Sequence, residues 1–179
     1  IFNVEKSIAE AILIQTIRSF LNEIGEGNHI VKINSLGDSD SRNRYTRELT
    51  AFLRKRLDEM PPVARELFRD HATNALLHLI EQEHDLANKS PSPLEHLSDT
   101  SRRHFRDIVE YLDMSETPYE IDPKLIGNYQ CFNDALFSFD FCDDQGMIAT
   151  EAPLIIKGGR YGSFIEKYLK QSVPAVGAV

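Results

Sequence analysis

Three phenylalanines at every second position dominate one segment of the chain. Phe137, Phe139 and Phe141 alternate with Ser138 and Asp140. Because successive side chains of a β-strand point to opposite faces, this alternation predicts a strand with one aromatic face and one polar face. The aromatic face has to be covered by further apolar elements. We therefore expect the domain to be organised around this strand and the segments that flank it.

The residues that follow the strand predict a hairpin. The run Asp143–Gly146 is rich in turn-forming residues, and a second strand is expected around Leu154–Ile156, leading into Gly158 and Gly159. Glycines at a strand end let the backbone come close to a ligand, because they have no Cβ atom. They fit equally a core hairpin with a glycine bulge. The pattern alone leaves both interpretations open.

Apolar residues at helical spacing predict a largely helical middle of the chain. Ser7 and Glu10 fit a capping box before an apolar helix that should end near Glu23 and pack on a sheet. Three more helices are expected at about Tyr45–Leu57, Val63–His84 and Ser98–Met114, and further strands at His29–Ile33, Thr117–Ile121 and Ser172–Val179. This order predicts an α/β (α+β) domain made of residues 1–37 and 116–179, with residues 38–115 as a helical insertion domain.

The charge of the chain limits how it can contact nucleic acid. The formal net charge is −8, so such a contact has to come from a local basic patch. One basic stretch occurs in the expected insertion, with Arg42, Arg44, Arg47, Arg54, Lys55 and Arg56. It suits phosphate contacts, and it also suits a solvated helix face.

Cysteine and histidine positions give no metal signature. The two cysteines, Cys131 and Cys142, form no CxxC pair, which favours a reducing, cytoplasmic compartment. His71, His78 and His84 are joined by no further ligand at metal-binding spacing, so no metal is expected. No apolar run approaches the roughly 20 residues of a membrane span, so no membrane partner is expected.

No motif in the chain names a reaction. P-loop, GxGxxG and GxSxG patterns are absent from the sequence. The first residue is not Met, and the last residues look like a strand that stops midway. We therefore expect an internal piece of a longer protein, with a small-molecule pocket at the glycine-rich strand.

A series of short segments carries a family resemblance. In chain order these are Lys32–Gly37, Ser101–Phe105, Pro118–Leu125, Leu136–Phe137, Gly158–Tyr161 and Pro174–Gly177. Their order resembles that of the histidyl-tRNA synthetases, which are class II aminoacyl-tRNA synthetases, and the resemblance covers essentially the whole chain. It implies an antiparallel sheet with flanking helices and a helical insertion, placed between motifs 2 and 3 of the family.

The resemblance also implies a chemistry. The family uses ATP and Mg²⁺ to activate histidine and then transfers it to tRNA, so the implied partners are histidine, ATP and, through the helical insertion, tRNA. A homodimer of the full-length protein is implied as well. A piece without the arginine-bearing motifs is expected to be inactive alone and to bind no cofactor tightly.

The departures from the family pattern fall in the implied site. Gly127 stands at the family's catalytic arginine, Cys131 and Phe132 at two substrate-contacting tyrosines, and Ser138 at a glutamate. No catalytic residue is therefore retained. The residues implied to bind histidine or the adenylate are Gly127, Cys131, Phe132, Gly158, Gly159, Arg160 and Tyr161, and those implied to face tRNA are the residues of the basic stretch.

Three hypotheses remain open at this point. The first is a divergent histidine–tRNA ligase. The second is a non-catalytic relative such as the regulatory subunit of ATP phosphoribosyltransferase, and the third is an interaction domain that has lost the pocket. The missing arginine favours the second and third, whereas the near-complete helical insertion favours the first.

Overall fold

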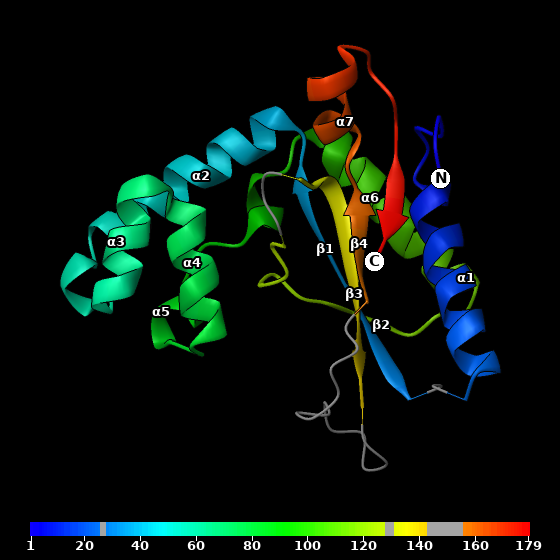
Figure 1. The fold of residues 1–179 in the computed structure, drawn as a ribbon, viewed down its shortest axis with the longest axis horizontal. Coiled ribbons are helices and arrows are strands. Elements are labelled where there is room, and N and C mark those ends of the chain that lie inside the picture. The colour runs from blue at the N-terminus through cyan, green and yellow to red at the C-terminus, as the bar shows by residue number, and fades with distance from the viewer. Residues whose placement is uncertain (26–27, 128–130, 143–155) are drawn as a thin grey trace.

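The structure is a computed structural model that describes residues 1–25, 28–127, 131–142 and 156–179 (Figure 1). The helices are α1 (Ile8–Glu23), α2 (Ser39–Arg54), α3 (Pro62–Asp70), α4 (Ala72–Glu81), α5 (Asp85–Asn88), α6 (Asp99–Met114) and α7 (Gly162–Leu169), with 3₁₀ turns η1 (Leu57–Glu59) and η2 (Pro93–His96). The strands are β1 (His29–Gly37), β2 (Tyr119–Ile121), β3 (Asn133–Phe141), β4 (Ile156–Arg160) and β5 (Val176–Ala178). Among these helices, none is both long and apolar enough to span a membrane.

The strands form one sheet in the order β2-β1-β3-β4-β5. The three pairs from β1 to β5 are antiparallel, and only β2 runs parallel to its neighbour β1. A parallel neighbour needs a long crossover, and here helices α2–α6 supply it. The predicted α/β class with flanking helices is confirmed, and the expectation of an antiparallel sheet is met except at this edge.

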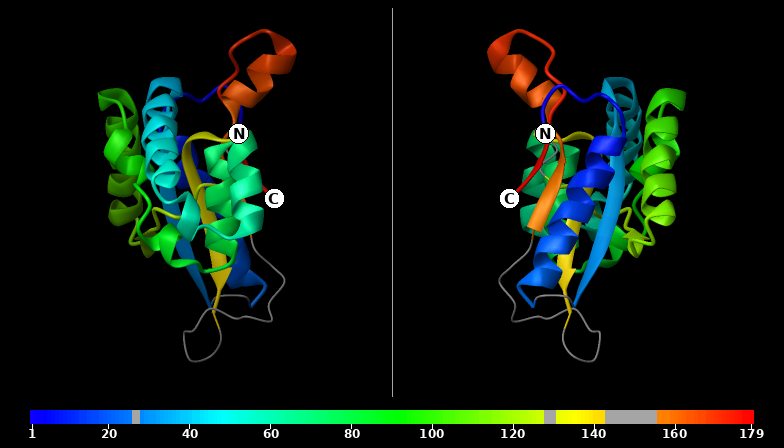
Figure 2. Two further views of the ribbon diagram at one scale, coloured as in Figure 1. Left: turned by 90° about the vertical axis from the view of Figure 1, so that its left-hand side faces the viewer. Right: turned by 90° about the vertical axis from the view of Figure 1, so that its right-hand side faces the viewer.

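The aromatic face of β3 is buried as predicted. Phe137 and Phe139 are almost fully buried and Phe141 nearly so. They share an apolar core with residues of β1, α1 and α6, among them Val31 and Ile108. Helices α1 and α6 contact each other and cover this face of the sheet (Figure 2). The opposite face of β3, which carries Ser138 and Asp140, takes no part in this core.

Helices α2 to α5 form a second apolar core. Tyr45, Leu49 and Leu79 are buried there together with Leu36 and Leu136 from the sheet. In Figure 1 these helices extend from the sheet as an arm. Helix α6 packs on the sheet instead. The division at residues 38 and 115 remains a prediction.

Two local helix predictions were wrong. The helix expected over Val63–His84 breaks at His71, whose backbone is extended (φ −155°) and whose Nδ1 accepts a hydrogen bond from Thr73 N at 3.3 Å. The histidine side chain caps α4, so α3 and α4 fold as two short helices. The capping box at Ser7 and Glu10 does not form, because the Ser7 side chain makes no cap bond and the Glu10 carboxylate binds elsewhere.

The expected hairpin partner of β3 is present, and the glycines lie inside it. Gly158 pairs with Phe137 in the β3–β4 ladder. A Cβ atom at Gly158 would lie 2.3 Å from Cζ of Phe137, so a phenylalanine ring occupies that space. The ladder has a register irregularity between Asn133 and Leu136, which agrees with a bulge. The expected turn residues 143–146 and the start of the second strand at Leu154 lie outside the described residues.

Candidate functional site

A cavity of about 800 Å³ lies between α4 and the polar face of the sheet. Its floor comes from β1, β3 and β4, and its rim includes residues 122–127. Apolar side chains such as Leu77 and Phe132 line it beside charged ones. A concave site of this size with an apolar wall and a few polar groups suits a small-molecule ligand. We call it the cleft.

The floor of the cleft holds a half-buried ion pair. Nζ of Lys32 lies 2.5 Å from Oδ2 of Asp140, and both side chains are 18% exposed. Burial lowers the pKa of Lys32, but the hydrogen bond and charge of Asp140, with the charges of Asp122 and Glu120, outweigh it and raise that pKa. Lys32 is therefore held as a cation with its counter-ion beside it.

Three of the predicted site residues meet at the cleft. Gly127, Phe132 and Gly158 all line it. Phe132 lies between two glycines: its Cδ2 would be 3.4 Å from a Cβ atom at Gly127, and its Cδ1 3.0 Å from one at Gly159. Gly127 has φ +51°, a left-handed conformation that glycine adopts without strain. The loop before β3 and the glycine strand are therefore adjacent, as the site hypothesis requires.

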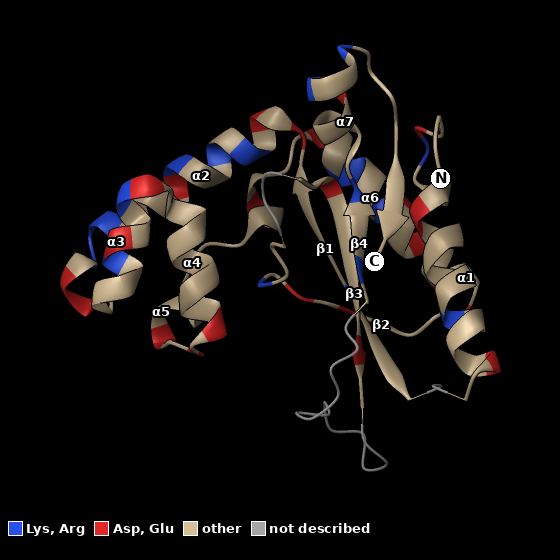
Figure 3. Cartoon of the chain, in the orientation of Figure 1, with Lys and Arg blue, Asp and Glu red and all other residues tan. Residues whose placement is uncertain are grey.

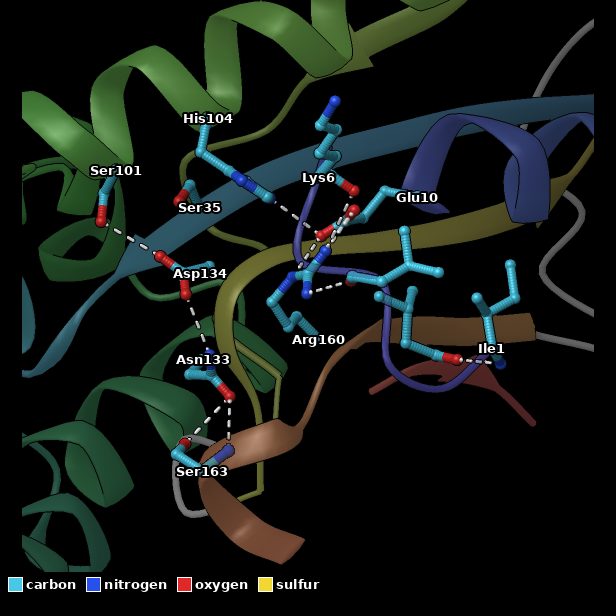
Figure 4. Close-up of polar contacts among 12 residues, drawn as sticks. Ile1, Lys6, Glu10, Ser35, Ser101, His104, Asn133, Asp134, Arg160 and Ser163 are labelled. Atoms are coloured by element: carbon cyan, nitrogen blue, oxygen red, sulfur yellow. Dashed lines mark hydrogen bonds and ion pairs between the residues drawn. The ribbon is translucent and has the colours of Figure 1, made fainter. Parts of the chain in front are cut away.

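The other predicted site residues lie elsewhere. Arg160 is 5% exposed, and its guanidinium binds Glu10 through Nε–Oε1 (2.7 Å) and Nη2–Oε2 (2.8 Å) (Figure 4). Tyr161 contacts the β5 backbone, since a Cβ atom at Gly177 would lie 3.0 Å from its Cε1. Cys131 is a half-buried free thiol that does not line the cleft. The binding roles of these residues remain predictions.

The Glu10 carboxylate joins three elements. It accepts hydrogen bonds from Arg160 of β4 and lies 3.0 Å from Nε2 of His104 on α6. Burial raises the pKa of Glu10, but the hydrogen bonds and charges of His104 and Arg160 hold it below its usual value. An ionised carboxylate thus ties α1, β4 and α6 together. The sequence does not reveal this role, because Glu10 also fits the spacing of a local capping residue.

A second polar chain fixes the start of β3. Oγ of Ser101 donates to Oδ1 of Asp134 at 3.0 Å, and Nδ2 of Asn133 donates to Oδ2 of Asp134 at 2.9 Å. Oδ1 of Asn133 then accepts from N and Oγ of Ser163 at 3.2 and 2.9 Å (Figure 4). The N-terminal turns of α6 and α7 are thereby joined through the residues that follow Phe132. This holds Phe132 at the cleft.

The residues of the basic stretch differ in exposure and in their contacts. Arg44, Arg47 and Arg54 are exposed and recur at helical spacing along α2, where Figure 3 shows blue segments. Arg44 also donates to the carbonyl of His96 at 2.9 Å. Arg56 instead lies over the Phe52 ring, 4.1 Å from its centroid. An exposed arginine stripe therefore exists on α2, with Arg42 half-buried and Lys55 exposed beside it.

The described residues contain no group of three His, Cys, Asp or Glu side chains that could hold a metal ion. Two of the histidines have local roles, since His71 and His84 accept hydrogen bonds from Thr73 N and Leu86 N at helix starts.

Comparisons with known proteins give similarity to histidine–tRNA ligases. No protein-family model matches the chain. It is 27% identical over 169 residues to the chloroplastic histidine–tRNA ligase of Porphyra purpurea, covering 94% of this chain and 38% of the relative. It is also 27% identical over 177 residues to the histidine–tRNA ligase of Caldanaerobacter subterraneus, covering 99% of this chain and 41% of the relative. The chain thus spans about two fifths of the length of these relatives.

Solved structures agree on the fold. The apo histidyl-tRNA synthetase of S. aureus superposes with a TM-score of 0.75 at 19% identity, covering 99% of this chain and 42% of that one. A Bacillus halodurans C protein described as an ATP phosphoribosyltransferase regulatory subunit/histidyl-tRNA synthetase gives a TM-score of 0.59 at 15% identity, covering 99% and 48%. The chain is therefore similar in sequence to part of the histidine–tRNA ligases and shares the fold of the corresponding part of a solved histidyl-tRNA synthetase.

Proposed function

We propose that the protein is a divergent histidine–tRNA ligase and that the cleft is where it binds histidine and ATP. The observation that carries the proposal is the meeting of Gly127, Phe132 and Gly158 at one cavity of about 800 Å³. These residues come from the segments that resemble the family's binding site. The length of the similarity to histidine–tRNA ligases, 94–99% of this chain, supports the same conclusion.

The reaction we propose has two steps. The carboxylate of histidine attacks the α-phosphate of ATP and displaces pyrophosphate, and the histidyl group then passes from the adenylate to the tRNA end. The cleft would contribute an apolar wall at Phe132 and Leu77 and positive charge from its lysines. Positive charge stabilises the charge that develops on the phosphate. ATP with Mg²⁺ is the expected cofactor set.

The helical arm is the proposed tRNA-facing part. Its candidate contacts are the exposed residues Arg44, Arg47 and Arg54 on α2, with Arg42, Lys55 and Arg56 as the remainder of the stretch. Phosphate contacts by arginines give sequence-independent, salt-sensitive affinity for nucleic acid. A cytoplasmic homodimer remains part of the proposal.

One observation favours a second candidate function. Gly127 brings no cation to the place of the family arginine, so a protein that binds ligand without activating it is a real alternative. The Bacillus halodurans C structure, whose description includes a regulatory subunit, shares the fold. An interaction domain without ligand binding is the third possibility.

Histidine-dependent exchange between ATP and pyrophosphate separates these functions. The full-length protein would be assayed with histidine and with no amino acid, and calorimetry would measure histidine and ATP binding in parallel. A ligase exchanges pyrophosphate only with histidine. A regulatory type binds histidine without exchange, and an interaction domain does neither.

A further inference from the structure

Three polar residues lie side by side on the cleft floor. Lys32 pairs with Ser138 across β1 and β3, and Ser138 pairs with Lys157 across β3 and β4. Directly opposed residues on neighbouring strands share a face, with Cβ atoms about 4.5–5.5 Å apart. All three residues line the cleft. The row therefore brings two ammonium groups to one wall of the cavity, with a hydroxyl between them.

The two lysines of the row differ in their partners. Both carboxylate oxygens of Asp140 already have partners. Oδ2 pairs with Nζ of Lys32, and Oδ1 accepts a hydrogen bond from Oγ of Ser138 at 3.2 Å. Lys157 is exposed, and no carboxylate in the described part of the chain lies within ion-pair distance of its ammonium. Lys32 is therefore neutralised, whereas the charge of Lys157 remains available to a ligand.

The place of Lys157 in β4 determines where its ammonium group lies. The backbone N–H of Lys157 donates to the carbonyl of Val179 at 2.9 Å, and its carbonyl accepts from Val179 N at 3.0 Å, so two hydrogen bonds fix its backbone against the residue that follows β5. The next residue, Gly158, directs its missing side chain toward Phe137 on the other face. Alternation along the strand thus turns Lys157 into the cleft, within reach of a ligand that also contacts Phe132.

We propose that Lys157 binds the anionic group of the ligand in the cleft, a phosphate or a carboxylate. Lys32 takes no part in this contact, because its ammonium is already paired with Asp140. Lysine suits this task as a flexible point charge that donates to oxyanions. The inference rests on the proposed function only in that both use the same cleft. Lys157 would thus supply positive charge to a site in which Gly127 stands at the position of the family's arginine.

Calorimetry of the full-length protein tests the inference. Pyrophosphate, ATP and histidine would be titrated into the wild type and into Lys157→Met, Lys157→Arg and the control Lys167→Met, which removes an exposed lysine of α7. We expect Lys157→Met to weaken binding about tenfold, as loss of one charge-assisted hydrogen bond does. Weakening for pyrophosphate and ATP identifies a phosphate, and weakening for histidine alone identifies the carboxylate.

The other variants complete the test. Lys157→Arg should keep most of the affinity, Lys167→Met should keep all of it, and the salt dependence of ATP binding should be smaller in Lys157→Met than in the wild type. Equal affinities of wild type and Lys157→Met for all three ligands would overturn the inference while the proposed function stands. A wild type that binds none of the three would overturn both.

Discussion

Nε of Arg160 lies 2.7 Å from Oε1 of Glu10, 150 residues away along the chain. Both side chains are almost fully buried, with exposures of 6% and 1%. The pair joins β4 to α1 on the face of the sheet opposite the cleft. Arg160 thus stabilises the fold in this structure, whereas Gly158, two residues before it, lines the cleft.

Removing either partner of this pair should destabilise the protein strongly. A buried charge left without its partner typically costs about 3–5 kcal/mol, so we expect losses of that order in the free energy of unfolding for Arg160→Met and Glu10→Gln. Urea denaturation followed by circular dichroism measures this. The control is Arg69→Met, because Arg69 and its partner Glu66 are 78% and 71% exposed and such pairs contribute little. Similar losses in all three variants would contradict the account.

Stability should fall in acid partly because of Glu10. Its pKa in the folded state lies below its ordinary value of 4.5. The stabilisation is therefore fully present above pH 4.5 and is lost as the pH falls through the folded-state pKa. The free energy of unfolding should decline less steeply below pH 4.5 in Glu10→Gln than in the wild type. The carboxyl group of Asp38, whose pKa is also lowered, should contribute equally to the pH dependence of stability in both proteins. Parallel curves for the two proteins would show that Glu10 does not cause the loss of stability in acid.

The glycine in β4 makes a packing prediction. Gly158→Ala would place a Cβ atom 2.3 Å from Cζ of Phe137, and overpacking of a core typically costs about 1–3 kcal/mol. Replacing the ring in the double variant Gly158→Ala/Phe137→Leu should relieve its part of the clash, whereas the contact with the carbonyl oxygen of Gly177, 2.7 Å from the same Cβ atom, remains. Thermal unfolding of the two single variants and the double variant gives the coupling energy. Strictly additive losses would mean that the two positions do not share that space.

The arginine stripe on α2 predicts salt-sensitive tRNA binding. The double variant Arg47→Gln/Arg54→Gln should weaken binding of tRNA and reduce the slope of log affinity against log salt by about 0.9 per lost phosphate contact. Filter binding at several salt concentrations measures both. The matched control Arg102→Gln/Arg106→Gln removes two exposed arginines of α6, outside the helical arm. Equal effects of the two pairs would show a response to net charge and not to the stripe.

Strong local patterns predicted much of the fold. The period-two phenylalanines placed the core strand, and apolar spacing located α1 and α6 closely, whereas α2 (Ser39–Arg54) begins six residues before the first residue of the expected helix, Tyr45. The break at His71 was not predictable in this way, because no glycine or proline marks it and a histidine side chain supplies the cap. Glu10 was misread for a related reason: a carboxylate three residues after a serine looks the same whether it caps its own helix or binds an arginine far along the chain.

The candidate site was only partly predictable. The motif order located Gly127, Phe132 and Gly158, which do meet at the cleft. The motif did not indicate that the side chain of Arg160 points to the face of the sheet opposite the cleft. Tertiary packing decides which face of a strand borders a cavity. The row Lys32, Ser138 and Lys157 depends on the register between three strands, which the sequence does not specify.

The most direct test of the central proposal is the histidine-dependent exchange of pyrophosphate into ATP by the full-length protein, measured beside calorimetric binding of histidine and ATP. The proposal predicts heat of binding for both ligands and exchange that requires histidine. Absence of histidine-dependent exchange would contradict it, whether the ligands bind, as in a regulatory type, or do not, as in an interaction domain.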